Sequence, residues 1–199
     1  MNILIFVEGG GNEPTIKAKC RNGFAEYCKR IPNLRRVPSI VACGGRDQAF
    51  KRFRTAVEDG RNGDVFVLLV DSEGPVNAAT AVEHLTSSDQ WNFPRLRQHR
   101  VFLMVQAMEA WFLADRAALE QFYGHSFRAN SLPGSAANIE TIRKEDLEPS
   151  LKRASRDTSK GEYHKTKHGF ALLALIDPAR VENSSPYAAA LHQLLREQL

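Results

Sequence analysis

Three carboxylates stand directly after two apolar segments of the sequence. Glu8 follows residues 2–7, and Asp71 and Glu73 follow residues 65–70. If these segments are neighbouring parallel strands, their carboxyl ends meet at one edge of a sheet, where ligands bind in open α/β folds. Carboxylates placed so close repel one another, and at least one takes up a proton unless a cation is present. Oxygen ligands of this kind suit Mg²⁺ or Mn²⁺, and we expect a metal site here.

The residues after Glu8 favour close approach of the backbone to a ligand. Gly9, Gly10 and Gly11 permit a tight turn, and a helix that begins after them offers N–H groups to an anion. The segment lacks the Gly-Lys-Ser/Thr ending of a P-loop and the GxGxxG spacing of a dinucleotide-binding turn. We therefore expect Gly9 and Gly10 to contact a phosphate without forming either motif.

Each acidic residue also has an ordinary explanation on its own. An Asp or Glu at the end of a strand is often a turn residue or a helix cap. Three such residues after two apolar segments favour a metal site over three unrelated turns.

Two later segments carry further candidates. Glu109 follows a fourth apolar segment and opens a helical one. It either helps to hold a second metal or is favoured there by the helix dipole alone. Lys165, Lys167 and His168 precede the apolar run at residues 170–176. Cations at a helix start oppose the dipole, which indicates either contact with a phosphate or oxyanion, or a solvated basic turn.

The charges of the chain are unevenly distributed around a net charge of +4. Residues 17–61 hold twelve Lys or Arg and four Asp or Glu, whereas residues 62–120 hold four and eight. This pattern is typical of an acidic centre beside a surface that binds polyanions, although amphipathic helices with solvated basic side chains produce it too. Arg46, Arg52 and Arg54 are the candidates for contacts with nucleic-acid phosphates.

The candidate residues lie among segments that read as strands and helices in alternation. Strands are expected at residues 2–7, 37–43, 65–70 and 101–106, and helices at residues 13–31, 45–59, 76–86 and 107–122. Most of the strands are continuously apolar, as in a parallel sheet covered on both faces. Pro38 and Ser39 indicate that the second strand lies at an edge. The alternation predicts an α/β fold with a Rossmann-like, mostly parallel sheet.

The last third of the chain shows no further strand pattern. Helices are expected near residues 145–155, 165–176 and 186–198. We therefore expect an α/β core at 1–123 and a helical extension at 124–199, packed together as a single domain.

The composition of the sequence indicates where in the cell the protein is located. No apolar run approaches the roughly 20 residues of a membrane helix, and the first residues lack the basic region of a secretory signal. Three cysteines without a paired motif are typical of reduced thiols. We expect a cytoplasmic protein that does not associate with membranes.

The residues at the strand ends resemble those of the Toprim domain, the catalytic module of topoisomerases, bacterial primases, small RNA-maturation nucleases and the overcoming-lysogenization-defect nucleases. The shared features are a first strand that ends in Glu-Gly and a later strand that ends in Asp-x-Asp/Glu-Gly. The MEAWFLAD segment at 108–115, with Lys165, His168-Gly169 and Ile176-Asp177-Pro178, resembles a family of stand-alone Toprim-like proteins of unassigned function. This similarity covers nearly the whole chain.

The resemblance implies roles for the three acids. Glu8 would be a metal ligand or a general acid–base, and Asp71 and Glu73 would hold Mg²⁺, although many Toprim domains have Asp where this chain has Glu73. The expected function is a Mg²⁺-dependent nuclease or related phosphodiester-processing enzyme acting on DNA or RNA, in which a carboxylate or Lys165 handles the proton. Relatives of this kind often work beside an ATPase partner in defence or toxin-like modules.

Two other hypotheses fit the same residues. In one, the chain is a catalytically silent module that binds metal or nucleic acid and regulates an ATPase partner. In the other, Asp71 accepts a phosphoryl group as in receiver-like domains, but such domains have paired acids after the first strand and here Glu8 is followed by glycines.

Overall fold

The computed structural model describes residues 2–59, 63–93, 100–134 and 137–198. Within these ranges, four strands form one sheet in the order β2-β1-β3-β4, with every neighbouring pair parallel. The strands are β1 (Ile3–Val7), β2 (Ser39–Ala42), β3 (Val65–Asp71) and β4 (Val101–Met104). The expected Rossmann-like α/β fold is therefore confirmed, and β2 lies at an edge as Pro38 and Ser39 indicated.

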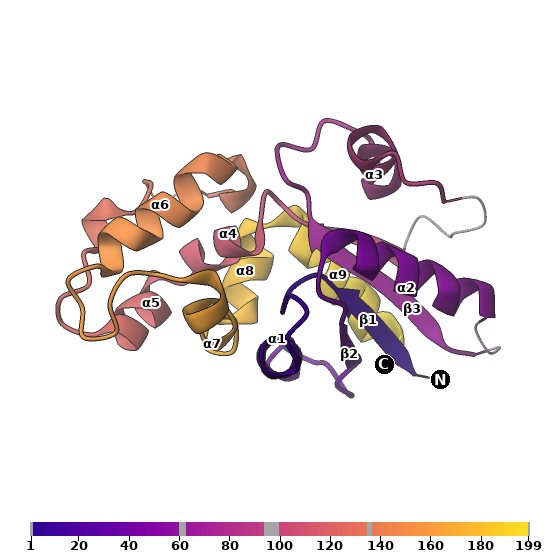
Figure 1. Ribbon diagram of the computed structural model, residues 1–199, viewed down its shortest axis with the longest axis horizontal. Coiled ribbons are helices and arrows are strands. Elements are labelled where there is room, and N and C mark those ends of the chain that lie inside the picture. The colour runs from indigo at the N-terminus through magenta and orange to yellow at the C-terminus, as the bar shows by residue number, and fades with distance from the viewer. Residues whose placement is uncertain (1, 60–62, 94–99, 135–136, 199) are drawn as a thin grey trace.

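Helices cover both faces of this sheet (Figure 1). They are α1 (Pro14–Lys29), α2 (Arg46–Asp59), α3 (Ala81–Asp89), α4 (Met108–Leu113), α5 (Arg116–Tyr123), α6 (Lys144–Ser155), α7 (Phe170–Leu173), α8 (Pro178–Ser184) and α9 (Pro186–Gln198). A π-helical turn, Lys165–Gly169, leads into α7.

The strands bury side chains on both faces, which explains their continuous apolar sequences. In β3, Val67 and Leu69 belong to the core cluster that α1 and the C-terminal helices complete. Leu68 and Val70 point to the opposite cluster, which includes Phe53 of α2. Because successive side chains of a strand alternate between faces, both faces of β3 must be apolar.

The helices after β4 are packed against the sheet and against α1. Helix α9 contacts β4, and α7 contacts α1. Figure 1 shows α4 to α8 gathered on one side of the sheet, with α9 passing behind it.

No helix in the described part of the chain is long and apolar enough to cross a membrane. The three cysteines are buried free thiols, and burial raises the pKa of Cys28 to about 12.

The single helix expected at residues 107–122 is two helices, α4 and α5. The break falls at Asp115, whose carboxylate accepts a hydrogen bond from the Ala118 N–H (3.2 Å) and caps α5. The same carboxylate accepts the Asp177 N–H (2.9 Å). The apolar periodicity continues through this cap, so the pattern alone does not reveal the break.

Two other boundaries differ from expectation. Helix α3 begins at Ala81 rather than at residue 76, because the Thr80 hydroxyl accepts the Glu83 N–H (3.1 Å) and caps it there. The helix expected at 165–176 is the π-helical turn followed by the short α7, and α8 was not expected.

Candidate metal centre

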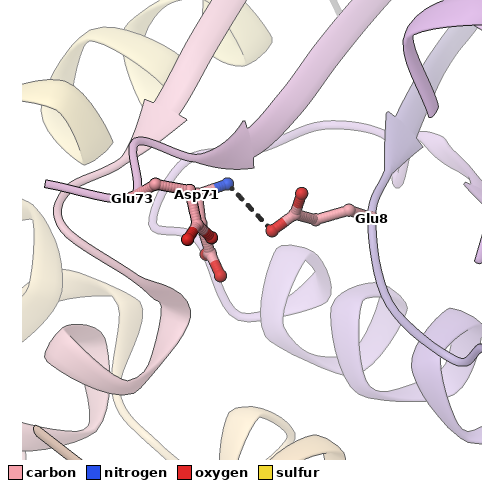
Figure 2. A group of neighbouring side chains, drawn as sticks. All are labelled: Glu8, Asp71 and Glu73. Atoms are coloured by element: carbon pink, nitrogen blue, oxygen red, sulfur yellow. Dashed lines mark hydrogen bonds between the residues drawn. The ribbon is translucent and has the colours of Figure 1, made fainter. Parts of the chain in front are cut away.

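Glu8, Asp71 and Glu73 lie together at the carboxyl ends of β1 and β3. These strands are neighbours, with Val7 beside Leu69, so the residues that follow them leave the sheet at the same edge. Each acid offers one carboxylate oxygen, and these oxygens lie within 4.8 Å of one another. Figure 2 shows the Glu8 side chain extending toward Asp71. The convergence that the strand ends predicted is present.

Asp71 is the buried member of this group, with 2% of its surface exposed. One carboxylate oxygen accepts the Met108 N–H (2.8 Å), and the other lies 3.5 Å from the Lys165 Nζ. Burial, reinforced by the Glu8 carboxylate, raises the pKa of Asp71 from 3.8 to about 8. Without a cation the carboxyl therefore keeps its proton at neutral pH, and a divalent ion at this position would replace that proton.

Glu8 joins the acidic group to Arg46. Its carboxylate accepts the Asp71 N–H (3.2 Å) and lies 3.4 Å from an Arg46 Nη. The Arg46 guanidinium is itself fixed, because it donates two hydrogen bonds to Asp89 (2.6 and 3.0 Å) and lies over the Trp91 ring. It also donates to the Asp71 carbonyl. A guanidinium held in this way is ready to meet an anion without reorganising.

Glu73 is the exposed member, with 45% of its side chain accessible. Its backbone has φ of +64°, a left-handed conformation that costs a non-glycine residue about 1 kcal/mol or more. Its N–H donates to the Gln106 carbonyl (3.0 Å), and its carboxylate pairs with Lys144. Such backbone conformations concentrate at functional sites, where the surrounding structure holds them.

The three acids open onto a cavity of about 260 Å³. Its lining residues come from the strand ends, the glycine loops and the turn before α7: Glu8, Gly9, Gly44, Arg46, Asp71, Glu73, Met104, Met108, Lys165 and Phe170. A water molecule takes up about 30 Å³ in the liquid, so the cavity has room for a cation with several waters. The donor set, carboxylate oxygens around open space, fits Mg²⁺ or Mn²⁺.

The glycines after β1 shape one wall of the cavity. Gly9 exchanges two backbone hydrogen bonds with Gly44 (2.7 and 3.1 Å), which joins the loop after β1 to the loop after β2. Gly44 has φ of +93°, and a Cβ there would lie 2.6 Å from the Gly11 oxygen. Gly10 is buried, and a Cβ on it would lie 2.8 Å from the Lys17 Cα. Gly9 therefore reaches the cavity, whereas Gly10 is required for packing.

Lys165 and Glu109 form the back of the site. The Lys165 Nζ lies between Asp71 and Glu109, 3.6 Å from the Glu109 carboxylate. Glu109 is 3% exposed, and it accepts a hydrogen bond from the Tyr163 hydroxyl (2.9 Å). Although burial lowers the pKa of Lys165, these two carboxylates raise it above its usual value. Glu109 thus faces Lys165, and it does not line the cavity in the described structure.

The other basic candidates lie outside the cavity. Arg52 and Lys167 are exposed, and Arg54 pairs with Glu58 (3.7 Å) on the surface of α2. His168 is 4% exposed, and its Nδ1 lies 3.2 Å from the Tyr123 hydroxyl. The expectation that His168 contacts a phosphate is corrected by this position, because an aromatic cluster surrounds the ring.

Several residues of the site were not found from the sequence. Asp89 orients Arg46, Lys144 pairs with Glu73, and Tyr163 contacts Glu109. Their partners are 43, 71 and 54 positions away. No local pattern reports contacts at such separations.

Comparison with known proteins assigns the family. A family model described as "Domain of unknown function (DUF4276)" matches residues 7–196, nearly the whole chain. No curated protein and no solved structure matches the sequence. The matched range includes Glu8, Asp71 and Glu73 and every other residue that lines the cavity. The chain therefore belongs to the DUF4276 family.

Proposed function

We propose that this chain is a Mg²⁺- or Mn²⁺-dependent enzyme that cleaves phosphodiester bonds in nucleic acid. The observation that carries the proposal is one cavity in which three carboxylates face two cationic side chains, Arg46 and Lys165. Carboxylates suit a hard divalent cation, and the two cations suit the oxygens of a phosphate. A bound divalent ion would polarise the phosphate and lower the pKa of water.

The protein's own residues have separate roles in this proposal. Glu8, Asp71 and Glu73 hold the metal. Arg46, held by Asp89, donates hydrogen bonds to a non-bridging phosphate oxygen, where negative charge increases in the transition state.

Lys165 and Glu8 would transfer the protons in this reaction. The raised pKa of Lys165 keeps its ammonium protonated at neutral pH, so it serves as a proton donor to the leaving oxygen and not as a base. The Glu8 carboxylate lines the cavity and is available to accept a proton from the attacking water.

Two further observations support a nucleic-acid substrate. Arg52 and Lys167 are exposed cations that add to the positive charge of the surface, and Arg54 is also exposed but pairs with Glu58. The Toprim resemblance of the Glu-Gly and Asp-Ser-Glu-Gly segments also favours phosphodiester chemistry, and through it we propose an ATPase partner. Fold alone does not decide function, so the proposal rests on the site.

The test is cleavage of labelled DNA and RNA with Mg²⁺ or Mn²⁺, by the wild-type chain alone and with an ATPase partner. Glu8→Gln removes one charge at nearly constant shape and should abolish cleavage. Because the three acids act as a unit, removing one should cost nearly as much as removing all three. Glu120→Gln changes an exposed carboxylate on α5 outside the cavity and should leave cleavage unchanged.

The outcomes separate the hypotheses. Undiminished cleavage by Glu8→Gln would place the chemistry elsewhere and refute the proposed site. Mn²⁺ binding without cleavage of either nucleic acid, even with the partner present, would identify a regulatory module instead of an enzyme. Labelling of Asp71 by a small phosphodonor would identify a phosphoryl acceptor.

A further inference from the structure

The ammonium of Lys165 occupies a position between two buried carboxylates. Its Nζ lies 3.5 Å from Asp71 Oδ2 and 3.6 Å from Glu109 Oε1. Asp71 and Glu109 are 2% and 3% exposed, and the Lys165 side chain, which is 46% exposed, reaches both carboxyl groups from the surface. Lys165 also lines the cavity that holds Glu8 and Glu73.

Lys165 contacts one carboxyl group of the acidic cluster and one outside it, as a second metal ion that shares a ligand with the first would. In two-metal phosphodiesterases the ions lie about 3.5–4 Å apart and share the substrate between them. Asp71 belongs to the group whose oxygens converge on a metal position, and it also contacts the ammonium. Glu109 is the carboxylate that a second ion would need, but its contacts are to Lys165 and to the Tyr163 hydroxyl.

The turn that carries Lys165 is anchored to α5. Lys165 begins the π-helical turn, and the buried His168 ends it beside Gly169. The His168 Nδ1 lies 3.2 Å from the Tyr123 hydroxyl of α5, and it accepts the His164 N–H (3.3 Å) within the turn itself. An ammonium beside Asp71 and Glu109 repels a divalent ion at the same position.

We propose that the Lys165 ammonium takes the place of a second metal ion, so that the cavity binds one divalent cation per chain. This inference rests on the proposed function, because it assumes that Glu8, Asp71 and Glu73 hold the first ion. It implies a site in which one metal ion and the Lys165 ammonium together stabilise the charge that two metal ions stabilise in two-metal phosphodiesterases. Glu109 and Tyr163 would position the lysine.

The experiment counts bound Mn²⁺ by electron paramagnetic resonance during titration of the full chain, after circular dichroism has established that each variant is folded. The wild-type chain should bind one ion. Lys165→Ala removes the ammonium and should bind two, with the exchange-coupled signal of neighbouring ions. Adding Glu109→Gln to Lys165→Ala should return the count to one. Lys152→Ala removes a lysine that pairs with Glu148 on α6, and should still bind one ion.

The possible results separate this inference from the proposed function. Two ions in the wild-type chain, or one ion in a folded Lys165→Ala variant, would overturn the inference and leave the metal site intact. No bound ion in the wild-type chain would refute the metal site itself, and the inference with it. If Lys165→Ala does not fold, Lys165→Gln keeps the aliphatic stem and is read in the same way.

Discussion

Replacing Asp71 by Asn should stabilise the metal-free protein at neutral pH. Burial and the Glu8 carboxylate raise the pKa of Asp71 to about 8, so the folded chain holds a proton that the unfolded chain releases near pH 4. Asn resembles the protonated carboxyl and can still accept the Met108 N–H. The Asp71→Asn variant therefore keeps the contact with the Met108 N–H and has no ionisation to suppress.

The magnitude follows from proton linkage. Between about pH 4 and pH 8 the folded chain binds more protons than the unfolded chain, so the free energy of unfolding falls as pH rises, by about 1.4 kcal/mol per pH unit. At pH 7 the loss in the wild-type chain reaches about 4 kcal/mol. Asp71→Asn also loses its pairing with Lys165, so we expect a net gain of about 2–4 kcal/mol, or roughly 5–10 °C in Tm.

The assay is urea unfolding of both proteins in EDTA at several pH values between 5 and 8. The difference between the two proteins reports Asp71 together with Glu109, whose pKa is raised by burial and by Asp71, because groups elsewhere in the chain titrate in both. The raised pKa of Lys165 lies above 10.5 and acts outside this window. Asp89 and Glu182, whose pKa values are lowered by Arg46 and Arg196, act only in acid.

Saturating Mn²⁺ should remove most of the stability difference between the two proteins. An ion present at about 100 times its Kd stabilises the wild-type chain by about 2.7 kcal/mol, and Asp71→Asn should lose most of this effect. A variant that is less stable than the wild-type chain at pH 7 in EDTA, with a difference that does not change with pH, would refute the reasoning. It would mean that Lys165 keeps Asp71 ionised in the folded protein.

Two other predictions follow from the loops and the basic surface. Gly44→Ala should lower the free energy of unfolding by about 2 kcal/mol or more in urea, because φ is +93° and a Cβ would meet the Gly11 oxygen. Gly45→Ala is the control, because a Cβ there meets nothing within 4 Å and should cost little. Binding of DNA or RNA should weaken steeply from low to physiological salt, and less steeply when Arg52 and Arg54 are neutralised; binding that is indifferent to salt would exclude a polyanion ligand.

The sequence predicted the parts of the site that depend on strands. An apolar run such as residues 65–70 reports a strand buried on both faces, and the polar residue after it reports where the strand ends. The parallel neighbours β1 and β3 then bring Glu8 to Asp71 without further information. Glycines after such an end predicted a tight turn, which the φ values of Gly9 (+124°) and Gly10 (+85°) confirm, and Gly9 lines the cavity.

The sequence could not predict contacts between residues that lie far apart along the chain. Lys144 pairs with Glu73 across 71 positions, and nothing in either neighbourhood records it. Asp115 separates α4 from α5 and caps α5, but the apolar pattern continues across it. The periodicity therefore predicted one helix where the structure has two. The segment around His168 has the composition of a basic turn, but the His168 ring is buried beside Tyr123. Only the tertiary packing determines that burial.

The bridge between Gly9 and Gly44 also limits how chains of this fold can diversify. That wall of the cavity consists of main chain, so substitutions cannot reshape it without breaking the link between two crossover loops. The opposite wall carries Glu73, an exposed side chain whose partner Lys144 comes from a distant helix. Substitutions of Lys144 can therefore alter the surroundings of the Glu73 carboxylate without breaking a main-chain link, and the glycine wall acts as the constant half of the site.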